Sequence, residues 1–136
     1  MSRKQSRETI FQLIFEYTFL KEKNTLSLED FLLKEKIEEE DKPYITTVYS
    51  EVISHYDELI SIVEENLKNY TLNRIYKVDL AILVLAVYEL KYIKDTPSSV
   101  VINEAVELSK KYSTDKSFSF INGVLASILG KMNDGA

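Results

Sequence analysis

The chemistry that this sequence could perform centres on one aromatic side chain, Phe120. On a helical wheel it lies roughly 100° from the centre of the apolar stripe, while Phe118 falls beside that stripe, on the core side. Lys111 and Lys116 are near it along the chain. A ring beside lysines can stack on a nucleic-acid base while the lysines bind phosphate. Burial of Phe120 against a neighbouring helix is the alternative, and geometry alone leaves it open.

A second basic group stands at the start of the chain. Arg3, Lys4 and Arg7 precede any acidic residue, and they could form a phosphate-binding patch or a solvated start. The whole chain has a net charge of −5, with acids concentrated in residues 35–41. That balance is not typical of a nucleic-acid-binding protein, but an acidic protein can still carry a basic face.

The residues for covalent or metal chemistry are missing from the sequence. There is no cysteine, and His55 is the single histidine, which excludes thiolate and multi-histidine metal sites. The three glycines match no phosphate-binding loop, and no G-x-S-x-G motif occurs. Glu104 and Glu107 could pair for acid–base work, but a solvated helix face explains them better. We therefore expect no catalysis, no cofactor and no metal site.

Composition indicates a helical domain in a reducing compartment. The chain has 136 residues, of which 45% are hydrophobic and 29% charged, with only three glycines and two prolines. Few turn-forming residues favour long helices with short connections. The longest apolar run, around Leu80 to Tyr88, is far shorter than the ~20 residues that a bilayer span needs. With a polar N-terminus and no signal peptide, we expect a cytoplasmic protein that does not bind membranes.

Hydrophobic periodicity predicts an all-α protein with about six or seven helices and no convincing strand. The break near residue 70 divides a single domain, residues 1–136, into helical subdomains of about 1–70 and 71–132 that share one core. The predicted helices cover residues 3–21, 28–36, 43–68, 78–93, 97–112 and 116–131, with a short turn of helix between 69 and 79.

The dipeptide Asn122-Gly123 tests the helical interpretation of the last segment. Asn-Gly between apolar residues is a strong hairpin signal. The apolar residues around it nevertheless follow helical spacing, at Ile121, Val124, Leu125 and Ile128. A glycine inside a helix costs about 1 kcal/mol relative to alanine. We therefore predict a helix in which Gly123 allows another helix to approach closely.

Four motifs in order resemble the NusB family of bacterial transcription antitermination factors. They are SRETIFQLIFEY near the start, VDLAILVLAVYELKYI, TPSSVVINEAVELSKKY and DKSFSFINGVLASI. The resemblance covers nearly the whole chain and is strongest from Val78 to Ile128. It implies an all-helical, NusB-like bundle with two subdomains of three or four helices.

The resemblance also implies a function without catalysis. Proteins of this family bind the boxA element of nascent RNA and pair with NusE, a small-subunit ribosomal protein. Through other Nus factors they act on the RNA polymerase elongation complex, which then transcribes ribosomal RNA operons past terminators. The implied partners are thus boxA RNA and NusE.

The family's RNA-contacting positions can be transferred to this chain. Its arginine-rich start aligns with Arg3, Lys4 and Arg7, although Gln5 stands where a basic residue often occurs. The aromatic residue of the family motif FxNGVL is Phe120, which the resemblance marks as an RNA contact.

Three further RNA contacts and one protein contact follow from the resemblance. Lys116 and Ser117 begin the last helix, whose free N–H groups favour phosphate, and Lys111 ends the preceding helix. Asp79 matches an acidic contact with the NusE-like partner. Val84 stands where many relatives have arginine, so one polar interaction of the family is missing.

Two alternatives remain open. The chain could be a NusB-like module that binds only proteins, since its basic N-terminal cluster is thin. It could also be a detached targeting domain of a ribosomal RNA methyltransferase, because NusB-like domains precede some of these enzymes. Self-association into a homodimer is compatible with either function.

Overall fold

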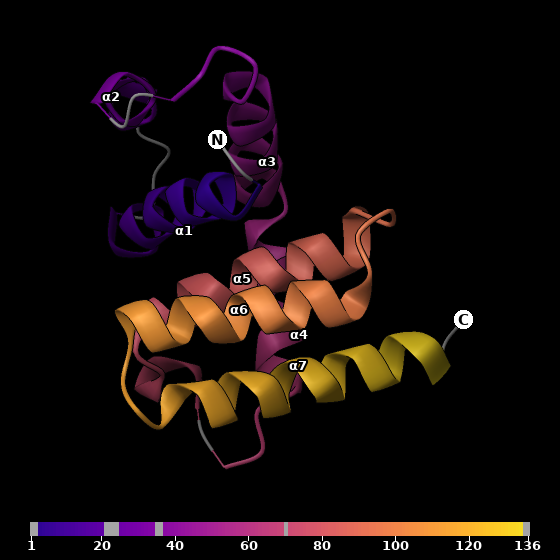
Figure 1. The fold of residues 1–136 in the computed structure, drawn as a ribbon. Helices are drawn as coiled ribbons and strands as arrows, with labels where there is room; N and C mark the ends of the chain where they lie inside the picture. The colour runs from indigo at the N-terminus through magenta and orange to yellow at the C-terminus, as the bar shows by residue number, and fades with distance from the viewer. Residues whose placement is uncertain (1–2, 21–24, 35–36, 70, 135–136) are drawn as a thin grey trace. The chain divides into compact units, whose positions relative to one another are not determined.

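The computed structural model describes residues 3–20, 25–34, 37–69 and 71–134, drawn as a ribbon in Figure 1. These residues form seven α-helices and one short 3-10 helix, and none of them lies in a strand. The all-α prediction is confirmed. The elements are α1 (Arg3–Leu20), α2 (Thr25–Lys34), α3 (Lys42–Ser54), α4 (Tyr56–Glu65), η1 (Leu72–Arg74), α5 (Lys77–Tyr92), α6 (Ser98–Tyr112) and α7 (Ser117–Asp134).

The single long helix predicted over residues 43–68 is wrong. The helix breaks at His55, whose φ and ψ are −104° and 14°, and α4 begins at the next residue. The chain also divides into two compact units at this point, unit 1 (residues 1–55) and unit 2 (residues 56–136). The predicted division of one domain near residue 70 stays a prediction. Periodicity could not detect the break, because the apolar spacing runs through it from Val52 to Tyr56 and Leu59.

Unit 1 is built on the packing of α1 against α3, with α2 against α1. Ile10 and Ile14 of α1 and Ile45 and Val52 of α3 are completely buried. Burying such a side chain contributes about 1.5–3 kcal/mol, so this apolar contact holds the unit together. The helix predicted over residues 3–21 is confirmed for Arg3–Leu20.

Unit 2 surrounds one apolar helix. Every residue of α5 from Asp79 to Leu90 is buried, and α4, α6 and α7 all pack against this helix. Figure 1 shows α5 and α6 side by side, with α7 beside α6. A helix that is apolar nearly all round has to be covered on most sides. The helix predicted over residues 78–93 is confirmed, and it forms the centre of this unit. No helix within the described residues is long and apolar enough to cross a membrane.

Asn122 and Gly123 lie inside α7, so the helical prediction for this segment is confirmed. The reason given for the glycine is wrong. A methyl group added at Gly123 would meet no atom within 4 Å, so no helix approaches there. Sequence shows where a side chain is missing, but only the tertiary structure shows what lies over that position.

Candidate nucleic-acid interface

A buried polar network holds the start of α7 against the first turn of α5. The hydroxyls of Ser113 and Ser117 donate hydrogen bonds to the two carboxylate oxygens of Asp79, at 2.5 and 2.9 Å. Asp79 and Ser117 are 3% and 2% exposed. A carboxylate in the first turn of a helix is also favoured by the helix dipole. Asp79 therefore fixes the α6–α7 connection to α5.

The hydroxyl protons of this network all have acceptors within the network. Each serine hydroxyl has one proton, and both protons go to Asp79. The Ser117 oxygen can then accept the hydroxyl of Thr114, 2.9 Å away. Because the network is complete, the start of α7 is pre-organised before any ligand arrives.

This placement bears on two predicted site residues. Ser117, expected to contact RNA, is buried with its hydroxyl bonded to Asp79. Asp79, expected to contact a protein partner, is equally buried. Both residues position the start of α7. A direct contact of either one with RNA or a partner stays a prediction.

Beside this network lies a pocket of about 540 Å³, here called the α7 pocket. Its buried polar residues, Asp79 and Ser117, form the inner wall, and exposed residues form the rim. The side chains that line it are Arg74, Ile75, Tyr76, Asp79, Thr114, Asp115, Lys116, Ser117 and Phe120. Aromatic rings, cations and buried acceptors thus surround one space, the combination with which proteins hold an unstacked nucleobase.

Phe120 also lines a second, shallower depression of about 180 Å³, the Gly123 depression. Asn66, Lys68, Asn69, Ser119, Gly123 and Val124 complete its lining. The Asn66 side chain is fixed there, since it donates to the Ile62 carbonyl at 2.8 Å and accepts from Ser127 at 2.7 Å. Phe120 therefore lies between two hollows, and its contact with RNA stays a prediction.

One of the two aromatic residues at the start of α7, Phe118, is not placed as predicted. Phe118, expected on the core side, is 44% exposed, whereas Phe120 is half-buried between the hollows. A helical wheel gives the direction of each side chain, but it does not show how far the neighbouring helices extend along α7. At the first turn of α7 the stripe is left uncovered at Phe118.

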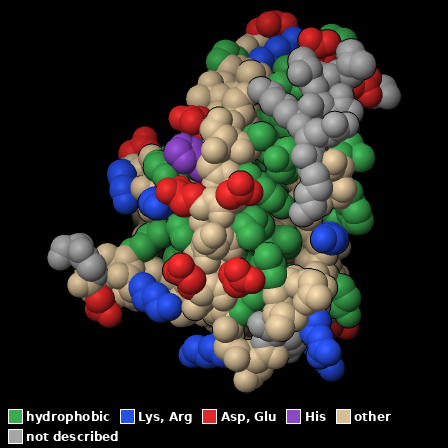
Figure 2. All heavy atoms as spheres, turned by 180° about the vertical axis from the view of Figure 1, so that it is seen from behind, with side chains coloured by type: hydrophobic (Ala, Val, Ile, Leu, Met, Phe, Trp, Pro, Cys, Tyr) green, Lys and Arg blue, Asp and Glu red, His purple; other side chains and the backbone are tan. Residues whose placement is uncertain are grey.

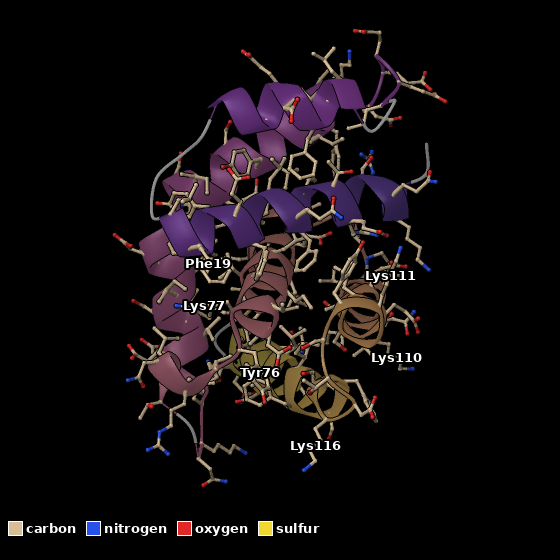
Figure 3. All side chains as sticks on the ribbon, turned by 90° about the vertical axis from the view of Figure 1, so that its left-hand side faces the viewer. Phe19, Tyr76, Lys77, Lys110, Lys111 and Lys116 are labelled. Atoms are coloured by element: carbon tan, nitrogen blue, oxygen red, sulfur yellow. The ribbon has the colours of Figure 1, made fainter. Side chains whose placement is uncertain are left out.

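Three lysines at the ends of α6 and α7 are exposed, and Figure 3 shows them on one side of unit 2 together with Tyr76. Lys110 lies 5.7 Å from the centre of the Phe118 ring, and Lys111 lies 5.4 Å from that of Tyr112. Lys116 lines the α7 pocket. Lys111 and Lys116, both predicted from the sequence, are therefore exposed as phosphate contacts must be.

The basic N-terminal residues belong to unit 1. Arg3 and Lys4 are exposed, and the Arg3 guanidinium lies 3.5 Å from the centre of the Tyr44 ring, a cation–π contact. Arg7 is only 6% exposed. Two of the three predicted residues thus present their charge to solvent, and Arg7 does not.

Three acidic side chains cluster in the segment that leads into α3. Carboxylate oxygens of Glu38, Glu40 and Asp41 lie within 4.8 Å of one another. A hydrogen bond between the two glutamates lowers the pKa of Glu38 and raises the pKa of Glu40. On the face drawn in Figure 2, Lys and Arg side chains are interspersed with Asp and Glu. We therefore expect nucleic acid to bind only where basic side chains gather.

Sequence reasoning missed Arg74 and Tyr76, which both line the α7 pocket. They lie in the segment that connects α4 and α5, interpreted from the sequence only as a break between helices. Loops on a rigid scaffold often carry binding residues, so an arginine and a tyrosine in this connection were a usable signal.

Fold and site together define an all-helical protein with a pre-organised pocket whose rim carries aromatic and cationic side chains. That class of surface suits single-stranded nucleic acid. The sequence model of the NusB family matches residues 4–130, and the chain belongs to the NusB family. The resemblance found in the sequence motifs is thereby confirmed.

Known relatives match nearly the whole chain. Transcription antitermination protein NusB of Finegoldia magna is 42% identical over 136 residues, which cover 100% of this chain and 99% of that protein. NusB of T. maritima superimposes with a TM-score of 0.87 at 28% identity, over 96% of this chain and 92% of that one. A chain in the crystal structure of antitermination factors NusB and NusE in complex with dsRNA matches with a TM-score of 0.84, also at 28% identity, over 95% of this chain and 96% of that chain.

Proposed function

We propose that this protein is an RNA-binding transcription antitermination factor. It binds boxA RNA together with the ribosomal protein NusE and promotes processive transcription of ribosomal RNA operons. It acts in the cytoplasm on the RNA polymerase elongation complex, through other Nus factors, without catalysing a reaction. The observation that carries this proposal is the full-length similarity to NusB proteins, among them one solved with NusE and dsRNA.

The side chains of the α7 pocket support RNA binding. The Phe120 ring stacks on a base, while Lys116 and Lys111 attract the phosphates around it. Arg3 and Lys4 of unit 1 add charge that is independent of RNA sequence. Asp79 and Ser117 hold the start of α7 in place, and the buried Arg7 supports unit 1.

A titration followed by fluorescence anisotropy tests the proposal. A labelled boxA RNA and a scrambled RNA of equal length are titrated with the protein, with and without a NusE protein, at two salt concentrations. We expect boxA to bind more tightly than the scrambled RNA, NusE to strengthen that preference, and salt to weaken it. Equal, negligible binding of both RNAs, even with NusE present, would refute RNA binding.

Three observations favour a second candidate, a module that binds only proteins. Arg7 is buried, Ser117 is bonded internally, and the net charge is −5, so fewer residues are available for phosphate than the family pattern implied. This candidate predicts that NusE binds with an affinity that boxA RNA leaves unchanged. Titrating labelled NusE with the protein, with and without RNA, separates the two functions.

A further inference from the structure

Tyr76 is the most exposed aromatic residue at the α7 pocket, and neither the sequence motifs nor the family assignment gives it a role. It lies between η1 and α5, with 63% of its surface exposed. Single exposed hydrophobic side chains are common on protein surfaces, but Tyr76 also lines the α7 pocket together with Phe120. We propose that Tyr76 is a second RNA-contacting residue, which together with Phe120 encloses one unstacked nucleobase in the α7 pocket. This inference rests on the proposed function.

The backbone of Tyr76 is held firmly although its ring is exposed. The preceding residue, Ile75, is 8% exposed and anchors the connection. The Tyr76 carbonyl accepts the N–H of Leu80 at 3.0 Å, which is the first hydrogen bond of α5. A ring on a fixed backbone loses little conformational freedom when a ligand binds, so its stacking energy is retained in the affinity.

The two rings come from different elements that line one pocket. Tyr76 precedes α5 and Phe120 belongs to α7, while Asp79 and Ser117 hold these two helices together at the inner wall. A base that enters the pocket can therefore contact an aromatic ring from either element. Asp79 and Ser117 also line this pocket, and the network that joins them keeps the two elements in fixed positions.

The charges at the rim suit a nucleotide. Arg74 and Lys116 are exposed lining residues whose positive charge attracts phosphate. Asp115 is the one exposed acidic residue that lines the pocket. In Figure 3, Tyr76 and Lys116 lie on the same side of unit 2. Two cations that accompany two aromatic rings are the arrangement that binds single-stranded RNA through its bases and backbone together.

The test compares four variants in binding to boxA RNA by anisotropy. Tyr76→Ala and Tyr76→Leu remove the aromatic face, and Tyr76→Phe retains it. Phe118→Ala is the matched control, because Phe118 is an exposed aromatic residue that does not line either hollow. We expect the alanine and leucine variants to bind about 5- to 100-fold more weakly, the range for loss of one base–aromatic stack, and the phenylalanine variant to bind within about twofold.

A spectroscopic readout distinguishes stacking from general loss of affinity. 2-Aminopurine is placed at successive positions of the RNA. At one position its fluorescence should be quenched when the unaltered protein binds, and Tyr76→Ala should restore that fluorescence. If the unaltered protein binds boxA but Tyr76→Ala and Phe118→Ala bind it equally, the inference about Tyr76 is overturned while the proposed function stands. Failure of the unaltered protein to bind RNA would overturn both. Because Tyr76 is exposed, thermal melting of its variants should match that of the unaltered protein.

Discussion

The N-terminal segment of unit 1 and the start of α7 in unit 2 both carry residues assigned to RNA, but the structure supports them differently. At α7, a complete network of buried hydrogen bonds around Asp79 fixes the positions of Lys116 and Phe120. In the N-terminal segment, Arg3 rests on Tyr44, and Arg7 is buried. We therefore expect the first region to contact a base and the second to supply mainly electrostatic attraction.

The largest effect should come from removing the Asp79 carboxylate, which organises the start of α7. Asp79→Ala leaves the hydroxyls of Ser113 and Ser117 without their acceptor. Hydrogen bonds to charged groups are worth about 1.5–3 kcal/mol each, so losing two of them should lower the free energy of unfolding by about 3–6 kcal/mol. Urea denaturation measures the change. Ser113→Ala, which retains the bond to Ser117, should cost less than half as much, and equal losses would contradict the central role of Asp79.

The next largest effect should come from the aromatic residue between the two hollows. Phe120→Ala should weaken boxA binding about tenfold, which is within the range for one stacked base. Phe118→Ala should leave the affinity within about twofold, since Phe118 lies outside both hollows. Anisotropy titrations of the two variants provide the comparison. Equal affinities would show that the contact is not made by Phe120.

A smaller effect should separate the N-terminal basic residues from one another. Lys4→Gln should leave stability unchanged and reduce the slope of log affinity against log salt by about 0.7, the value for one phosphate contact on a single strand. Arg7→Gln should instead lower the melting temperature, because Arg7 is buried. Titrations at four salt concentrations and a thermal melt test both expectations. If Arg7→Gln reduced the slope of log affinity against log salt and Lys4→Gln did not, Arg7 rather than Lys4 would be the phosphate contact.

The smallest expected effect concerns the glycine of the last helix. Gly123→Ala should raise the free energy of unfolding by up to about 1 kcal/mol, because alanine favours the helix and its methyl group meets no atom within 4 Å. Chemical denaturation measures this gain. A loss of stability would indicate that something covers Gly123, as the sequence had suggested.

Much of the fold could be predicted from local pattern. The apolar spacing of α1, the nearly uniform hydrophobicity of α5 and the helical register through Asn122-Gly123 all identified elements that the structure contains. These features depend on which residues recur every three or four positions, and that information is present in any short window of sequence. The break at His55 was missed because the same spacing continues across it.

For the site, the sequence by itself determined the residue types, among them Phe120, Lys111, Lys116 and the absence of cysteine. Only the tertiary structure decided which of these residues are exposed, and which residues of other elements surround them. It buried Arg7 and Ser117, exposed Phe118, and brought Tyr76 and Arg74 into the lining that Phe120 shares. The physical reason is that burial depends on packing between segments distant in the chain, and a helical period carries no information about that packing.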